Sequence, residues 1–92
     1  MAYFTWNPDK NAKLLLERDI SFESAVFCIE NGNLLDVVQH PNPAIYPDQK
    51  LFIVEIDKYA YLVPFVENCE EVFLKTIILS RKATKKHLGD EQ

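Results

Sequence analysis

The sequence predicts a single α+β domain in which helices pack on an antiparallel β-sheet. Its 92 residues, 48% of them hydrophobic, supply one modest core and no second domain. Helical spacing of apolar residues in the first third gives way to alternating runs from residue 34 onward, an order that is typical of this class. The chain has no run of eighteen apolar residues and no leader-like start, so we expect a cytoplasmic protein without membrane contact.

The N-terminal third is predicted to hold a short strand and two helices. The opening YFTW alternates aromatic and small residues, as a strand does. Asn7 and Pro8 form a favourable cap and first position for a helix that should run to about Arg18. Ser21 is predicted to cap a second helix, which Gly32 should end in a left-handed conformation. The apolar stripe of this second helix consists of Phe22, Ala25, Val26 and Ile29.

Four strands are predicted from residue 34 onward. LLDVVQH is the first, and the segment PNPAIYPDQ, with three prolines in nine residues, is a loop that cannot pair. KLFIVEID, YAYLVPFV and EVFLKTIIL are rich in β-branched and aromatic residues and predict an antiparallel meander. Pro64 lacks an N–H donor, so we expect a bulge or an unpaired side there. The helices should cover one sheet face and leave the other partly open.

The last helix is predicted to begin after Ser80 and to stop at Gly89. Residues 1–74 carry five bases and twelve acids, whereas residues 75–92 carry five bases and two acids, in a chain of net charge −4. At about 100° per residue, one arc of this helix holds four bases, namely Arg81, Lys82, Lys85 and Lys86. The first two lie where the helix dipole disfavours cations. The stripe therefore favours binding to RNA phosphate or a carboxylate-rich partner over an ordinary solvated helix.

Other candidate side chains stand alone. His40 precedes the proline-rich loop and is either an acid–base group or a solvated histidine. Glu55 alternates with Ile53, so it is either an inward carboxylate or the end of an exposed face. Tyr61 shares a strand face with Tyr59, as core rim or as a stacking platform for bases. With two glycines and two isolated cysteines, the chain predicts no phosphate loop, no metal site and no cofactor.

Two motifs lie at the ends of the chain. The first places an aromatic residue, a tryptophan, an asparagine and a lysine before a Ser-Phe-Glu helix start; its residues are Phe4, Trp6, Asn7, Lys10 and 21–23. The second is IILSRKATKKHL. It begins with an Ile-Ile pair and continues to Arg81, Lys82, Ala83, Thr84 and further bases. In this order and separation the two motifs resemble those of the BrnT family, the toxins of bacterial type II toxin–antitoxin systems.

The resemblance implies a RelE-like fold and ribonuclease activity without a metal. It also implies a cognate antitoxin, usually a ribbon-helix-helix DNA-binding protein. A homodimer and a heterotetramer with the antitoxin both stay open. Metal-free cleavage needs a proton acceptor, a proton donor and fixed positive charge on the phosphate. Arg81 is the expected phosphate clamp, beside Lys82, Lys85 and Lys86 for flanking phosphates. Further candidates for the catalytic set are Lys10, His40, Glu55 and Tyr61.

The chain departs from the family pattern at positions that bear on activity. The family usually has Lys-His-Gly before its Ser-Phe-Glu segment, and here Arg18 replaces the histidine and Asp19 the glycine. An arginine common on the strand before the basic segment is replaced by Thr76, and the adjacent Lys75 points to the opposite face. These departures leave open a second hypothesis, a non-catalytic BrnT-like interaction module that acts only in a regulatory complex.

Overall fold

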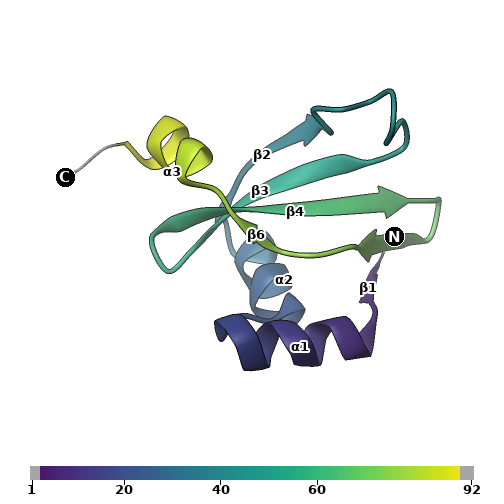
Figure 1. Cartoon of the computed structure of the whole chain (residues 1–92), viewed down its shortest axis with the longest axis horizontal. Coiled ribbons are helices and arrows are strands. Elements are labelled where there is room, and N and C mark those ends of the chain that lie inside the picture. The colour runs from purple at the N-terminus through teal and green to yellow at the C-terminus, as the bar shows by residue number, and fades with distance from the viewer. Residues whose placement is uncertain (1–2, 90–92) are drawn as a thin grey trace.

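The computed structural model describes residues 3–89, which form three helices and six strands (Figure 1). In chain order these are β1 (Tyr3–Trp6), α1 (Pro8–Arg18), α2 (Phe22–Glu30), β2 (Leu34–Gln39), β3 (Lys50–Ile56), β4 (Tyr59–Glu67), β5 (Glu71–Leu74), β6 (Ile78–Leu79) and α3 (Arg81–Leu88). The strands form one sheet in the order β1-β5-β4-β3-β2, with β6 paired to β4. The predicted α+β class is confirmed. Within residues 3–89, no helix has the length and apolar character needed to cross a membrane.

The sheet is mixed, so the expectation of a wholly antiparallel sheet is wrong for β1. The β2–β3, β3–β4 and β4–β5 pairs are antiparallel, as predicted, but β1 runs parallel to β5. A parallel pair needs a long connection, which α1, α2 and three strands supply here. Aromatic packing holds β1 in place. Phe4 meets the edge of Phe52 with ring centroids 6.1 Å apart, and Trp6 stacks on Phe22 at 5.6 Å.

All three helices begin at the predicted caps. In each case a side-chain oxygen accepts a hydrogen bond from a first-turn amide, and the caps are Asn7, Ser21 and Ser80. α1 ends at Arg18 and α3 ends before Gly89, both as predicted. α2 ends at Glu30 with Asn31 as its cap, one residue before the expected Gly32. Gly32 still supplies the left-handed turn, with φ of +91°.

Two apolar clusters lie on opposite faces of the sheet. The larger joins β3 and β4 to α1 and α2, and includes Leu14, Phe22 and Val54. The smaller joins Ile53 to Ala83 of α3. Because neighbouring strand residues point to opposite faces, α3 covers the face opposite α1 and α2 (Figure 1). The expectation that all helices share one face is therefore wrong for α3.

The last predicted strand is interrupted opposite Pro64, so EVFLKTIIL forms β5 and β6 instead of one strand. Leu74 and Ile78 are four residues apart, whereas their partners on β4 are three residues apart. The carbonyl of Pro64 accepts a hydrogen bond from the Lys75 amide at 2.8 Å. The N–H and C=O groups of one strand residue point to the same neighbouring strand, so the N–H that Pro64 lacks would also have faced the β5–β6 side. The absent donor explains the irregularity that the sequence predicts.

Arg18 and Asp19, which depart from the family pattern, both have structural roles. Arg18 Nη1 donates to the carbonyl oxygen of Ile77 at 3.1 Å, in the break between β5 and β6. The Ile77 side chain is buried, so this bond ties the end of α1 to the core. Asp19 caps α1 with φ of 55° and ψ of 37°, a left-handed conformation that favours glycine.

Candidate nucleic-acid interface

The four bases of α3 lie on its solvent side. All four side chains are exposed, whereas Ala83 is buried and Leu88 is half-buried against the sheet. The bases are Arg81, Lys82, Lys85 and Lys86. Within residues 3–89, the one ion pair joins Lys50 to Glu67 on β3 and β4. No carboxylate of this part of the chain therefore neutralises the basic stripe of α3.

Thr84 attaches α3 to the sheet. Its Oγ1 accepts a hydrogen bond from the amide of Ala60 at 2.8 Å and donates one to the carbonyl of Ser80 at 2.7 Å. The Ser80 amide donates to the Ala60 carbonyl at 3.1 Å, and the Ser80 hydroxyl caps the amide of Ala83. Ala60 is fully buried. In the RKAT segment, the alanine and threonine thus anchor the helix, while the arginine and lysine face solvent.

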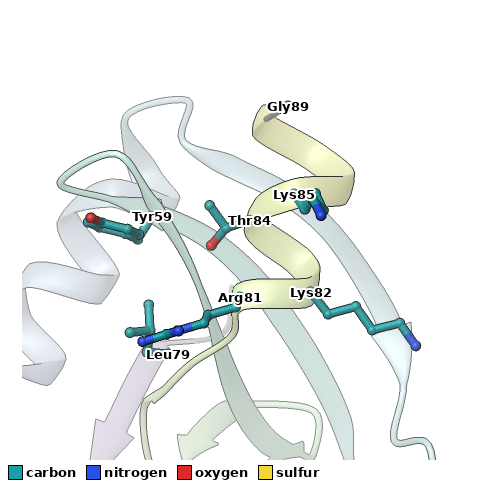
Figure 2. Close-up of a pocket in the computed structure, with 7 residues that line it drawn as sticks. All are labelled: Tyr59, Leu79, Arg81, Lys82, Thr84, Lys85 and Gly89. Carbon is teal, nitrogen blue, oxygen red and sulfur yellow. The ribbon is translucent and has the colours of Figure 1, made fainter. Parts of the chain in front are cut away.

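A groove of about 540 Å³ lies along α3, between this helix and the start of β4 (Figure 2). Its apolar wall is formed by the exposed Tyr59 and Leu79. Figure 2 shows the Arg81 side chain extending toward Leu79, whereas Lys82 points to the other side of the helix. Thr84, Lys85 and Gly89 complete the lining. The groove therefore combines cationic groups with an aromatic and an aliphatic surface.

Tyr59 is the site residue that the alternating pattern of β4 does not distinguish from Tyr61. The turn before it consists of Asp57 and Lys58, both with positive φ, which is the geometry of a tight hairpin. Tyr59 is the first residue of β4 after this turn and is 53% exposed. Tyr61, in contrast, packs against the larger core cluster. The position of Tyr59 directly after the Asp57-Lys58 turn is the sequence feature that could have distinguished it from Tyr61.

The predicted candidates for proton transfer do not line the groove. The His40 ring packs on Tyr46 with centroids 4.5 Å apart, and its Nδ1 accepts a hydrogen bond from the Asn42 amide at 3.0 Å. This loop joins β2 to β3 at the end of the sheet away from α3 (Figure 1). Lys10 lies in the first turn of α1, on the opposite face from α3. Tyr61 is half-buried in the core rim.

Glu55 is the candidate placed at the α3 end of the sheet. It pairs with Ala60 across β3 and β4, and its side chain is half-buried. Its amide donates a hydrogen bond to the carbonyl of Asn33, just after α2, at 2.9 Å. Burial and, to a lesser extent, the Glu55 carboxylate raise the pKa of the Cys28 thiol of α2. Lys75, the base beside Thr76, lies over the Phe73 ring at 5.6 Å. Neither side chain belongs to the lining of the groove.

The arrangement at α3 is therefore suited to hold phosphate and a flat apolar group, and Arg81, Lys82 and Lys85 all contribute to the lining of the groove. It does not bring an imidazole or a carboxylate of residues 3–89 into the groove. No family model, curated protein or solved structure matches this chain.

Proposed function

We propose that the chain is a BrnT-like toxin of the cytoplasm that cleaves RNA without a metal and is neutralised by a cognate antitoxin. One observation carries this proposal: the four bases of α3 are exposed, and none forms an ion pair with a carboxylate of residues 3–89. Arg81 is the proposed clamp, because its planar fork matches two phosphate oxygens and its side chain extends into the groove. Lys82, Lys85 and Lys86 would then hold flanking phosphates.

The local roles of the motif residues support the resemblance. Asn7 and Ser21 cap α1 and α2, and Trp6 stacks on Phe22 of the Ser-Phe-Glu segment. Asp19 stands where the family has glycine, and its left-handed backbone is one that glycine adopts without strain. The family's residue types at these positions thus suit the backbone and the packing of this fold.

The chemistry that the groove supports best is charge stabilisation. In metal-free cleavage the RNA 2′-hydroxyl loses its proton to water and its oxygen attacks the neighbouring phosphorus, while the bond from phosphorus to the 5′-oxygen breaks and that oxygen takes a proton from water. The products are a 2′,3′-cyclic phosphate and a free 5′-hydroxyl, and negative charge accumulates on the phosphate during the attack. A fixed guanidinium beside that phosphate lowers the barrier, and removal of one such donor typically costs about 100- to 1,000-fold in rate. Arg81 supplies this group in the proposal, with Lys85 beside it.

Arg81→Ala tests the toxin proposal. We expect this variant to relieve growth arrest on induced expression and to reduce RNA cleavage about 100-fold or more, while its thermal unfolding stays unchanged. Lys13→Ala is the matched control, since Lys13 is an exposed base of α1 on the opposite sheet face. If expression of the wild-type chain is harmless and the purified protein leaves RNA intact at low salt, the proposed ribonuclease activity is excluded.

A second candidate function is favoured by the scattered acid–base residues. The groove lacks an imidazole or carboxylate of residues 3–89, as expected for a BrnT-like module that binds its partner without cleavage. In that case RNA turnover is absent for every variant. Binding to a cognate antitoxin persists and is measurable by calorimetry. Turnover by purified wild-type protein that Arg81→Ala abolishes would exclude this candidate.

A further inference from the structure

Tyr59 presents an exposed aromatic side chain at the groove. The side chain is 53% exposed, whereas the next residue of the strand, Ala60, is fully buried. Tyr46 in the proline-rich loop stacks with His40, but Tyr59 stacks with no ring of residues 3–89. The tight turn at Asp57 and Lys58 fixes the backbone just before it. The backbone before Tyr59 is thus defined by the turn, and its ring has no aromatic partner among the described residues.

The groove places this ring beside positive charge. Tyr59 and Leu79 form its apolar wall, and Arg81 extends along the same side toward Leu79 (Figure 2). Lys85 lies one turn further along α3. A nucleotide has the matching two parts, a flat base with a π-face and an anionic phosphate. The volume of about 540 Å³ also falls within the range of sites that enclose small molecules.

We infer that the groove accepts an unpaired RNA base stacked on Tyr59, with the adjacent phosphate held by Arg81, so that the ligand is single-stranded RNA. This inference rests on the proposed RNA contact of α3 and names its substrate class. Duplex RNA offers phosphates to the basic stripe but keeps its bases stacked inside the helix. A single strand can turn a base outward onto the tyrosine. Tyr59 therefore acts as a binding residue that separates single strands from duplexes.

The test measures binding to two probes that differ only in their bases. The first is a fluorescently labelled 2′-O-methyl oligoribonucleotide of about twelve nucleotides, which cannot be cleaved through its 2′-oxygen. The second is the same strand with abasic sugars. We expect Tyr59→Leu to weaken binding of the first probe about 5- to 100-fold and to leave the second unchanged. Tyr59→Phe should bind like the wild type, since it retains the ring.

The matched control is Tyr3→Leu, which removes a tyrosine of similar exposure, 60%, from β1. This change should affect neither probe. A direct readout on the wild-type protein is the fluorescence of a 2-aminopurine base in the first probe, which stacking should change and which Tyr59→Leu should restore to the free value. This second measurement reports stacking even if the leucine variant is less stable.

The outcomes separate the inference from the function on which it rests. If Arg81→Ala weakens both probes but Tyr59→Leu weakens neither, the basic stripe binds RNA and the stacking inference is wrong. If Tyr59→Leu weakens both probes equally, the tyrosine is structural and the inference also fails. If the wild type binds neither probe at low salt but binds polyglutamate, the groove is a protein interface and the proposed RNA contact falls as well.

Discussion

The attachment of α3 can be tested by replacing Thr84 with valine. The two side chains have nearly the same shape and branching, so Thr84→Val removes the hydroxyl and little else. The Ser80 carbonyl keeps a second donor, because the backbone amide of residue 84 also bonds to it at 3.0 Å. The amide of Ala60 loses its acceptor at a residue that is fully buried. The substitution thus leaves one buried donor without a partner.

The expected loss is about 2 kcal/mol in the free energy of unfolding, since a buried unsatisfied donor costs about 1–3 kcal/mol. For a domain of this size, a loss of 1 kcal/mol lowers Tm by about 4–8 °C, so the variant should unfold about 8–16 °C below the wild type. Urea and thermal denaturation followed by circular dichroism measure both quantities. RNA affinity should fall with stability, because Thr84 holds the helix that carries the bases.

Thr84→Ser is the matched control, because it keeps the hydroxyl and loses one methyl group. It should cost less than half as much as the valine variant, since both hydrogen bonds can still form. If Thr84→Val is as stable as the wild type to within about 0.5 kcal/mol, the bond to Ala60 does not hold α3, and the explanation of the RKAT segment is wrong.

Two further changes probe the N-terminal helices. Asp19→Gly should raise the free energy of unfolding by about 0.5 kcal/mol, because the left-handed cap at φ of 55° costs aspartate some strain and costs glycine none. Lower stability of the variant in urea would show that the aspartate side chain matters more. Asn11→Ala should cost about 1 kcal/mol through the lost bond of Asn11 Oδ1 to the Phe22 amide at 2.7 Å. Asn11 Nδ2 also donates a hydrogen bond to the Glu23 carboxylate, and this bond is the main cause that lowers the pKa of Glu23. In the Asn11→Ala variant that pKa should therefore rise toward its ordinary value, as an NMR titration would show. Because the pKa of Glu23 is lower in the folded than in the unfolded state, this stabilisation is present above the unfolded pKa and is lost as pH falls through the folded pKa. The difference in free energy of unfolding between Asn11→Ala and the wild type should therefore narrow in acid. A difference that stays constant with pH would contradict this account.

Features that depend on a few neighbouring residues were predictable from the sequence. The caps at Asn7, Ser21 and Ser80 act within one helical turn, so residue type and spacing suffice to place them. Pro64 lacks a donor wherever it lies in a sheet, which is why the irregularity opposite it was also predictable. The parallel pairing of β1 and the side of the sheet that α3 covers depend on contacts between distant segments, and no local pattern encodes them.

The same distinction applies to the candidate site. The basic stripe follows from helical periodicity alone, and the structure places its four side chains in solvent. Whether Tyr59 or Tyr61 meets the core depends on how far α1 and α2 extend over β4, which periodicity cannot show. His40 and Arg81 lie toward opposite ends of the sheet because the strand register, rather than their own chemistry, sets those positions.

Among residues 3–89, the position of α3 at one end of the longest axis separates positive from negative charge (Figure 1). Residues 3–80 carry six bases and twelve acids, whereas α3 carries four bases and no acid. The axis of 40 Å is several times the screening distance of about 8 Å at physiological ionic strength. An approaching polyanion is therefore attracted at one end and repelled along the rest of the body. Encounters are oriented before contact, and the rate of arrival, as well as the residence time, should fall as salt is added.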